Sequence, residues 1–295
     1  MARFTGVIPA LLTPFDGSGE VSASMLKKLV AFHIDAGVQG LWLCGGSAEA
    51  YALSVRERKA IVEVVVAEAA GRVDVIVHVG DNSTEVACEL ARHAEGIGAD
   101  AVACFPPVMP KLSAEALRSH YRKVASACGG LPFIAYNVPG LTGVRVDESV
   151  MASLLDIENL SGVKHSEYNL FDLRNTIELA ADRLSVLEGC DEILLAALAM
   201  GAHGGVGLTY NFAPGVYLEI YRSFNAGDVL KAQQEQFRMT RFIRRAIFRY
   251  GMHATMKEAM RLLGYDCGPP RTPVLPLGDE ERAGVKKELE EAGLV

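Results

Sequence analysis

Lys164 is the side chain of this sequence best suited to covalent chemistry. It closes a short apolar run in SGVKHSEY that predicts a buried strand, whereas the other lysines fall on polar helical stretches or in a loop. Burial disfavours an ammonium ion, so neutral amine should be available near neutral pH. A neutral amine attacks a ketone to form an imine. The alternative is a structural lysine whose ammonium group reaches solvent from the strand end.

A tyrosine ends the strand that precedes this lysine along the chain. The segment FIAYNVPGLTG predicts a strand whose last residue is Tyr136, followed by Asn137 and a turn at Pro139-Gly140. Consecutive parallel strands lie side by side, so the phenol and the Lys164 amine should meet at one end of the sheet. A phenol beside an iminium relays protons as a general acid and base. The alternative is a packed tyrosine whose hydroxyl bonds to the backbone.

A glycine-rich turn follows the strand predicted at residues 41–44. In LWLCGGSAEAYALS, the backbone N–H groups around Gly46 and Ser47 can form a concave site for a carboxylate, and the Ser47 hydroxyl adds a donor. A tight structural turn is the alternative, because glycine-rich turns after strands are common and phosphate-binding loops have longer signatures.

Eight short apolar runs alternate with amphipathic helical stretches and would position these groups. Such alternation favours parallel strands with right-handed crossovers, and eight units favour a closed (β/α)₈ TIM barrel of the α/β class. Barrel enzymes carry their catalytic groups at the carboxyl ends of the strands, where Lys164 and Tyr136 fall. The predicted strands are Val7–Leu12, Leu41–Cys44, Val75–Val79, Ala101–Cys104, Phe133–Tyr136, Gly162–Lys164, Ser185–Leu187 and Gly205–Gly207.

Helix starts and a helical tail complete the predicted architecture. Ser22, Ser54 and Ser113 are expected to be helix N-caps, and Glu57 gives the second of these the spacing of a capping box. Residues 1–225 are assigned to the barrel, and residues 226–295 to a C-terminal helical extension packed on the barrel side within a single structural unit. The predicted helices of the extension are Asp228–Tyr250, His253–Leu263 and Glu280–Ala292.

Length, charge and cysteine usage limit the class of protein. The 295 residues, half of them hydrophobic, suffice for one barrel domain, and the net charge of −7 argues against nucleic acid as a partner. The most apolar segment, Ile193–Met200, is too short to span a membrane, and the first residues lack a secretory pattern. Six cysteines without CxxC spacing and seven histidines without ligand spacing predict free thiols, a cytoplasmic protein and no metal site.

Four segments in order resemble the dihydrodipicolinate synthase/N-acetylneuraminate lyase family of class I pyruvate-dependent aldolases. They are GGSAE, YNVPGLTG, GVKHS and EGCDEILLAALAMGAHGGVG, and the similarity runs from GVIPALLTPFD to the C-terminal helices. The resemblance implies a TIM barrel, commonly a homotetramer, without a metal or an organic cofactor. It makes Lys164 the Schiff-base lysine and Tyr136 the proton-relay phenol. It assigns the substrate to Gly46, Ser47, Ser166, Gly189, Asp191, Glu192 and Val206, with the pyruvate carboxylate at the first two.

Several positions resemble the N-acetylneuraminate lyase branch more than the synthase branch. Leu141 stands where the synthases carry an arginine that grips a substrate carboxylate, and Met109 where they carry a tyrosine used by a neighbouring subunit. Gly189, Asp191 and Glu192 match positions with which sialate lyases hold the sugar, since carboxylates accept hydrogen bonds from polyols. Equally, the two acids would complement the dipole of the helix that ILLAALAM predicts.

Two positions depart from the lyase pattern. The family loop G-[ST]-[ST]-G-E reads GGSAE here, so the first hydroxyl, which links the tyrosine to the substrate, is absent at Gly46. Leu208 stands where sialate lyases carry a serine. Rapid turnover would then need water or a substrate hydroxyl in place of the missing relay.

We therefore expect an aldolase or lyase that acts on a hydroxylated 2-oxo acid, such as a sialic acid or a 2-keto-3-deoxy sugar acid, with an aldehyde as the second partner. Lys164 would form the imine, and Tyr136 would take the C4 hydroxyl proton as the C3–C4 bond breaks. One alternative is a synthase that condenses pyruvate with an aldehyde, including a 4-hydroxy-tetrahydrodipicolinate (dihydrodipicolinate) synthase with an unusual site. Another is a non-catalytic protein that binds 2-oxo acids, which Gly46 and Met109 motivate.

Overall fold

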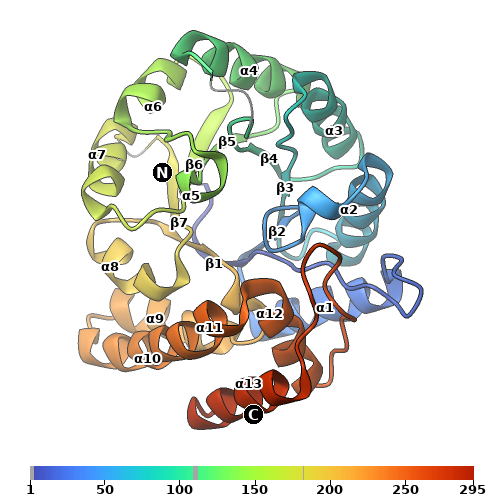
Figure 1. The fold of residues 1–295 in the computed structure, drawn as a ribbon. Coiled ribbons are helices and arrows are strands. Elements are labelled where there is room, and N and C mark those ends of the chain that lie inside the picture. The colour runs from blue at the N-terminus through green and yellow to red at the C-terminus, as the bar shows by residue number, and fades with distance from the viewer. Residues whose placement is uncertain (1–2, 109–111, 182) are drawn as a thin grey trace.

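Eight parallel strands form the wall of a barrel, and helices surround it (Figure 1). The computed structural model describes residues 3–108, 112–181 and 183–295. The strands pair in the order β1-β8-β7-β6-β5-β4-β3-β2. They are β1 (Gly6–Pro9), β2 (Gly40–Leu43), β3 (Asp74–His78), β4 (Ala101–Cys104), β5 (Phe133–Asn137), β6 (Leu160–His165), β7 (Ser185–Glu188) and β8 (Gly204–Gly207).

Backbone hydrogen bonds between β1 and β2 close the ring. Leu11 N donates to Trp42 O at 2.9 Å, and Gln39 N donates to Val7 O at 3.1 Å. Ala10 and Trp42 also pair as a parallel bridge. The predicted (β/α)₈ barrel is thus confirmed, and all eight predicted strands overlap the observed ones.

The helices around the barrel begin at the predicted caps. The side chains of Ser22, Ser54 and Ser113 each accept a hydrogen bond from the backbone N–H three residues further on, and Ser54 forms the expected capping box with Glu57. The helices are α1 (Ala23–Ala36), α2 (Val55–Ala69), α3 (Thr84–Gly96), α4 (Ala114–Ala127), α5 (Pro139–Thr142), α6 (Glu148–Leu154), α7 (Leu170–Ala180), α8 (Leu194–Ala199) and α9 (Pro214–Asn225), with short turns η1 (Ala50–Ala52), η2 (Asp191–Ile193) and η3 (Thr209–Asn211).

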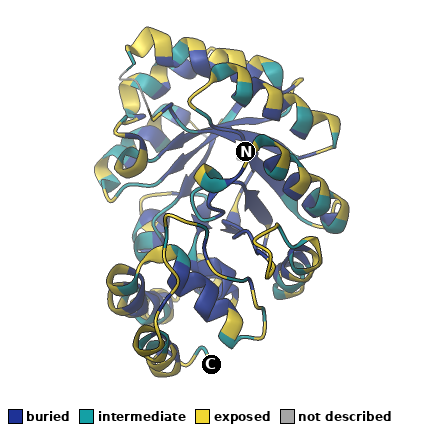
Figure 2. Cartoon of the chain, turned by 45° about the vertical axis from the view of Figure 1, so that its right-hand side comes forward, coloured by how far each residue is buried: buried dark blue, intermediate teal, exposed yellow. Residues whose placement is uncertain are grey.

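Residues of each strand alternate between two buried layers. One layer fills the barrel interior, and the other packs between the barrel wall and the helices, so the strands are buried except for the half-buried Asp74 and Ser161 (Figure 2). Tyr136 belongs to the interior layer, and Lys164, its partner in the strand register, faces the same way. His165, one residue on, faces the opposite side, where Asn137 Nδ2 lies 3.3 Å from its Nδ1. This confirms that His165 points away from the lysine.

The C-terminal extension forms the three predicted helical segments. The first is continuous through α10 (Val229–Phe242), the π-helical turn η4 (Ile243–Ile247) and α11 (Phe248–Tyr250), and α12 (Met252–Leu262) and α13 (Asp279–Glu291) follow. Figure 1 shows the extension along the side of the barrel near α8, α9 and α1. Its cysteine, Cys267, is free like the other five. Within the described ranges, none of the helices has the length and apolar character needed to cross a membrane.

Candidate active site

The amine of Lys164 lies inside the barrel near the carboxyl end of β6. The side chain is only 4% exposed, and Nζ lies 4.5 Å from the centroid of the Tyr136 ring and 4.6 Å from that of the Trp42 ring. Lys164 makes no ion pair with any described residue. The amine is therefore shielded from water and free of a carboxylate, which are the conditions for nucleophilic attack on a ketone.

Tyr136 and Lys164 are directly opposite each other on neighbouring strands, because they are Cα partners in the β5–β6 register. The Tyr136 ring meets Trp42 edge-on, with centroids 5.4 Å apart, and meets the His78 ring edge-on at 5.7 Å. These aromatic contacts hold the phenol in one orientation beside the amine. The predicted proximity of the two side chains is confirmed, and the catalytic role of each stays a prediction.

A buried histidine that the sequence did not single out packs beneath the phenol. His78 Nδ1 donates to Cys44 O at 2.9 Å, and the ring stacks on Phe105 with centroids 4.6 Å apart. Burial, together with the positive charge of Arg58, lowers the pKa of His78 to about 3. The imidazole is therefore neutral and serves as an aromatic support for the site.

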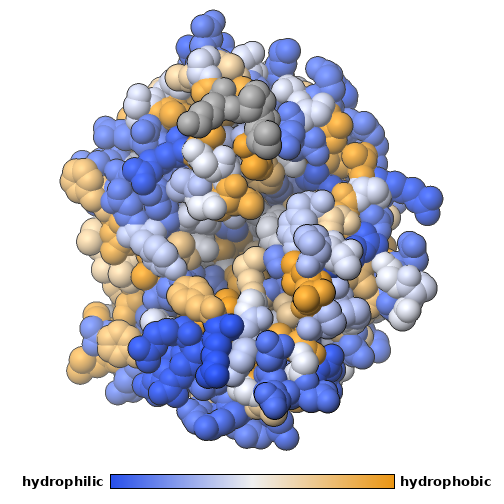
Figure 3. All heavy atoms as spheres, in the orientation of Figure 1, coloured by the Kyte–Doolittle hydropathy of each residue, from blue (hydrophilic) through white to orange (hydrophobic). Residues whose placement is uncertain are grey.

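A cavity of about 350 Å³ opens above Lys164 at the barrel mouth. Figure 3 shows this face of the molecule with a hollow near its centre. All of the residues predicted from the sequence to act or bind line the cavity, so the structure brings the whole set together. They are Lys164, Tyr136, Gly46, Ser47, Ser166, Gly189, Asp191, Glu192 and Val206.

The turn after β2 presents free donors to this cavity. Among the described residues, the N–H groups of Gly46 and Ser47 have no hydrogen-bond acceptor, whereas Gly46 O accepts bonds from Glu49 N at 3.0 Å and His253 Nε2 at 2.8 Å. The two N–H groups and the Ser47 hydroxyl thus remain available to an anion. This geometry fits the predicted carboxylate site.

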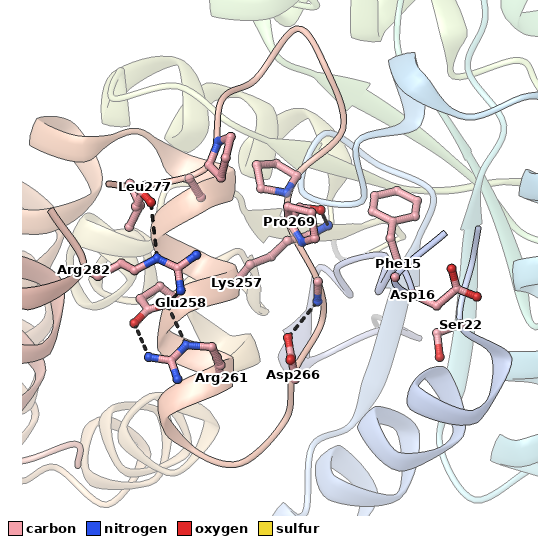
Figure 4. A pocket seen from close by; sticks show the side chains of 15 residues that line it. Phe15, Asp16, Ser22, Lys257, Glu258, Arg261, Asp266, Pro269, Leu277 and Arg282 are labelled. Atoms are coloured by element: carbon pink, nitrogen blue, oxygen red, sulfur yellow. Dashed lines mark hydrogen bonds and ion pairs between the residues drawn. The ribbon is translucent and has the colours of Figure 1, made fainter. Parts of the chain in front are cut away.

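A buried ion pair anchors the same turn to the C-terminal extension. Glu49 is fully buried, and its carboxylate lies 2.9 Å from Lys257 Nζ and accepts a bond from Arg271 N at 2.7 Å. Lys257 also donates to Pro269 O at 3.0 Å, and its Nζ lies 4.0 Å from the centroid of the Phe15 ring (Figure 4). Lys257 lies on a helix as predicted, but it is buried and not on a polar face, because its partners are remote in sequence.

A second cavity, of about 640 Å³, lies beside this ion pair and away from the predicted site (Figure 4). Three of its charged side chains are paired with one another. Glu258 binds Arg261 at 2.6 Å and lies 3.4 Å from an Arg282 nitrogen. This cavity contains none of the residues singled out for chemistry, so we place the active site at the barrel mouth.

Ser166 and Gly189 lie together next to the lysine. The Ser166 Oγ is buried and has no hydrogen-bond partner in the described part of the chain. A β-carbon at position 189 would lie 1.8 Å from this Oγ and 3.0 Å from Lys164 Cε. A glycine is therefore required at 189 for steric reasons, and the Ser166 hydroxyl remains available to a substrate.

The two acids after β7 already have hydrogen-bond partners. The Asp191 carboxylate accepts bonds from Leu208 N at 3.1 Å, Thr209 N at 2.5 Å and Thr209 Oγ1 at 2.6 Å. Burial raises the pKa of Asp191 to about 6, although the bonds from Thr209 lower it. Glu192 accepts a bond from the Tyr168 hydroxyl. Asp191 thus ties the loop after β7 to the loop after β8, and its predicted contact with a sugar stays untested.

Apart from Leu141 and Leu208, the outer part of the cavity consists of residues that sequence reasoning did not assign to the site. The extension contacts α8 and α9 through α10, and η4, α11 and α12 contribute residues to the cavity at the barrel mouth. An amphipathic helix pattern shows that one face is buried, but not which surface covers it. Met109, where a synthase tyrosine was considered, lies outside the described residues. The apolar lining consists of Val138, Leu141, Leu208, Ile243, Ile247, Phe248 and Met252.

Enzymes that form imines need an amine held out of water with a proton carrier nearby, and Lys164 and Tyr136 meet this requirement at the mouth of a TIM barrel. The model of the dihydrodipicolinate synthetase family matches residues 3–292, and the chain belongs to this family. Family members are lyases and synthases that act through a Schiff base on a lysine, so this protein is an enzyme of that kind.

Similar proteins carry names from both branches of the family. A 4-hydroxy-tetrahydrodipicolinate synthase from Methanothrix thermoacetophila is 36% identical over 97% of this chain and 96% of its own length. An N-acetylneuraminate lyase from Mediterraneibacter gnavus is 32% identical over 97% of this chain and 92% of its own length. The crystal structure of YagE, a prophage protein of the dihydrodipicolinic acid synthase family from E. coli K12 in complex with pyruvate, covers both chains completely with a TM-score of 0.95 and 29% identity. The predicted resemblance to this family is confirmed.

Proposed function

We propose that this enzyme is a class I aldolase that binds pyruvate as an imine on Lys164 and breaks or forms the C3–C4 bond of a hydroxylated 2-oxo acid. The observation that carries the proposal is the buried Lys164 amine, 4.5 Å from the Tyr136 ring and without an ion-pair partner among the described residues. A pyruvate complex is known for YagE, a structural neighbour with the same fold, and supports the choice of ketone.

In the cleavage direction, the Lys164 amine adds to the ketone carbon and expels water. The resulting iminium withdraws electrons from C3, and Tyr136 takes the proton of the C4 hydroxyl as the C3–C4 bond breaks. An aldehyde leaves, and the enamine that remains is protonated at C3 and hydrolysed to pyruvate. The N–H groups of Gly46 and Ser47 would hold the carboxylate throughout, and the Ser166 hydroxyl is a further donor beside the imine.

The proposed reaction needs neither a metal ion nor an organic cofactor, because the iminium itself accepts the electrons of the breaking bond. Activity should therefore survive dialysis against EDTA, and a loss that zinc or magnesium restores would contradict this part of the proposal. By resemblance to the family we also propose a homotetramer in the cytoplasm. Light scattering on the purified chain tests the homotetramer.

The relatives suggest two kinds of specific activity. An N-acetylneuraminate lyase-like or 2-keto-3-deoxy sugar acid aldolase-like enzyme would use Asp191 and Glu192 to orient the sugar end. A synthase would condense pyruvate with an aldehyde and is suggested by the relative from Methanothrix thermoacetophila. One assay measures the release of pyruvate from N-acetylneuraminate and from 2-keto-3-deoxy sugar acids, and the other measures the condensation of pyruvate with aspartate semialdehyde. Comparing the two rates distinguishes a lyase from a synthase. A non-catalytic protein would bind pyruvate in calorimetry and turn over none of these compounds.

Borohydride trapping tests the imine directly. Reduction in the presence of pyruvate should attach a stable three-carbon adduct to the peptide that contains Lys164, and mass spectrometry locates it. Lys164→Ala should give neither adduct nor activity, whereas Lys287→Ala, which removes an exposed amine from α13, should retain both. A Lys164→Ala enzyme with full activity would exclude the mechanism.

A further inference from the structure

We propose that the aldehyde partner of this enzyme is uncharged and apolar, with an aliphatic or aromatic group in place of a carboxylate, a phosphate or a polyol. This inference rests on the proposed aldolase function and specifies the substrate class of the same site. The 2-oxo acid that it cleaves or makes would then carry a hydrocarbon substituent on C4.

The position of pyruvate defines where the aldehyde must lie. With the carboxylate on the turn of Gly46 and Ser47 and the ketone carbon on Lys164, the three carbons of pyruvate occupy the inner end of the cavity. The aldehyde and its substituent then extend outward, between the loops after β5 and β8 and the helices of the C-terminal extension. The side chains that line this outer part are Val138, Leu141, Leu208, Ile243, Ile247 and Phe248.

The charges around the cavity disfavour an anionic aldehyde. Lys164 is the only lysine or arginine among the described lining residues, and the imine uses its nitrogen. His253 is also in the wall, but its Nε2 donates to Gly46 O at 2.8 Å. Asp191 and Glu192 add negative charge. A carboxylate or phosphate placed here would lose water without gaining a cationic partner, which is strongly unfavourable.

Most polar side chains near the outer part are bonded to one another or to neighbours, and among the described residues the exposed Tyr51 hydroxyl is the exception. The Thr209 hydroxyl bonds to Asp191 and lies 2.6 Å from the Tyr217 hydroxyl. Asp191 accepts three bonds, and Glu192 accepts one from the exposed Tyr168. A polyol would therefore bury hydroxyls against hydrocarbon with few free partners, whereas an aliphatic or aromatic group gains from the same contacts.

The condensation with such an aldehyde balances without any further reactant. The Tyr136 oxygen, deprotonated when water leaves the carbinolamine, takes a C3 proton from the iminium of pyruvate to give the enamine, and C3 then attacks the aldehyde carbon to form the new bond. The aldehyde oxygen takes a proton from Tyr136 as the nitrogen lone pair restores the iminium. Water adds to the iminium, and the 4-hydroxy-2-oxo acid leaves with the Lys164 amine regenerated.

A series of aldehydes condensed with pyruvate by the full-length enzyme tests the inference. The apolar set is acetaldehyde, propionaldehyde, butyraldehyde and benzaldehyde, and the polar set is glyceraldehyde, aspartate semialdehyde and N-acetylmannosamine, with product measured by NMR. We expect kcat/KM to rise about fourfold for each added methylene and to exceed the polar set by at least about tenfold. A higher kcat/KM for any member of the polar set would overturn the inference.

A charge introduced at the outer wall provides the matched variant. Leu141 is 49% exposed, so Leu141→Arg should fold, and it should raise the ratio of kcat/KM for aspartate semialdehyde to that for butyraldehyde by at least about tenfold. Leu230→Arg makes the same change at an exposed position of α10 outside the cavity and should leave the ratio unchanged. An unchanged ratio in Leu141→Arg would count against the inference.

The borohydride adduct distinguishes failure of the inference from failure of the proposed function. An adduct on Lys164 together with preference for a polar aldehyde would overturn only the apolar assignment. Absence of the adduct would overturn the imine mechanism and the inference with it.

Discussion

The Nζ atom of Lys164 lies 4.6 Å from the centroid of the Trp42 ring, and Trp42 is the single tryptophan of the chain. Trp42 comes from β2 and reaches across the barrel interior to the lysine on β6, where it also meets Tyr136 edge-on. An ammonium or iminium nitrogen over an aromatic face is stabilised by the electron density of the ring. The chain therefore carries a natural optical probe in contact with its reactive amine.

Pyruvate should change the fluorescence of this tryptophan in a saturable way, because imine formation alters the charge and the substituent of the nitrogen beside the ring. The measurement is a fluorescence titration of the unmodified protein. Lys164→Ala should show no saturable change, and Lys287→Ala should behave like the parent. An equal response in Lys164→Ala would show that the probe does not report on the imine.

Tyr136→Phe should lower kcat by about 10²–10⁴, because it removes the proton relay and keeps the ring. The aromatic contacts with Trp42 and His78 do not involve the hydroxyl, so the variant should fold normally. Steady-state kinetics and borohydride trapping together check the prediction, since the adduct on Lys164 should still form. A kcat within twofold of the parent would remove Tyr136 from the mechanism.

Gly46→Ser should raise kcat by up to about tenfold, because it restores a hydroxyl where the family resemblance expects one. The structure can accept the change, since no heavy atom lies within 4 Å of a β-carbon at this position. Gly189→Ala is the contrasting variant, because its β-carbon would collide with Ser166 Oγ and press on Lys164. If Gly46→Ser had a lower kcat than the parent, and Gly189→Ala had the same kcat as the parent, this description of the cavity wall would be wrong.

Lys257→Met should destabilise the fold by about 3–5 kcal/mol, because it leaves the buried Glu49 carboxylate without its cationic partner. The free energy of unfolding in urea measures the loss. Adding Glu49→Gln should recover part of it, since the remaining side chain is then neutral. The KM for pyruvate should also rise in the single variant, because Glu49 holds the turn that carries Gly46 and Ser47. If Lys257→Met had the same free energy of unfolding as the parent, the stabilising role assigned to the ion pair with Glu49 would be wrong.

Stability should fall between about pH 4.5 and pH 8 because of Glu188. Burial raises the pKa of this carboxyl from 4.5 to about 8, so the folded state holds a proton that the unfolded chain releases. The stabilisation that the protonated Glu188 carboxyl contributes is fully present below pH 4.5 and is lost as the pH rises through 8. Glu188→Gln keeps an oxygen to accept the bonds from Gly189 N and Cys190 N, which measure 2.8 and 2.7 Å in the parent.

The melting temperature of Glu188→Gln should exceed that of the parent at pH 8.5, and the difference should shrink toward pH 5. Differential scanning calorimetry at both pH values checks this. A difference of the same size at both pH values would indicate a packing effect unrelated to titration.

Local patterns of the sequence determined the elements and the order in which they follow one another. Apolar runs predicted all eight strands, and serine caps at Ser22, Ser54 and Ser113 predicted three helix starts, because both signals depend on residues a few positions apart. The same reasoning brought Tyr136 and Lys164 together, since consecutive parallel strands are neighbours in the barrel.

The tertiary structure alone decided which remote segments complete the site. Trp42 reaches Lys164 only because the barrel closes between β1 and β2, and Glu49 meets Arg271 from 222 residues away only because the C-terminal extension folds back. Helical periodicity predicts a buried face in η4 and α12 but gives no information about the surface that covers it. The apolar wall of the cavity, and with it the proposed preference for an apolar aldehyde, therefore depends on long-range packing that no local pattern encodes.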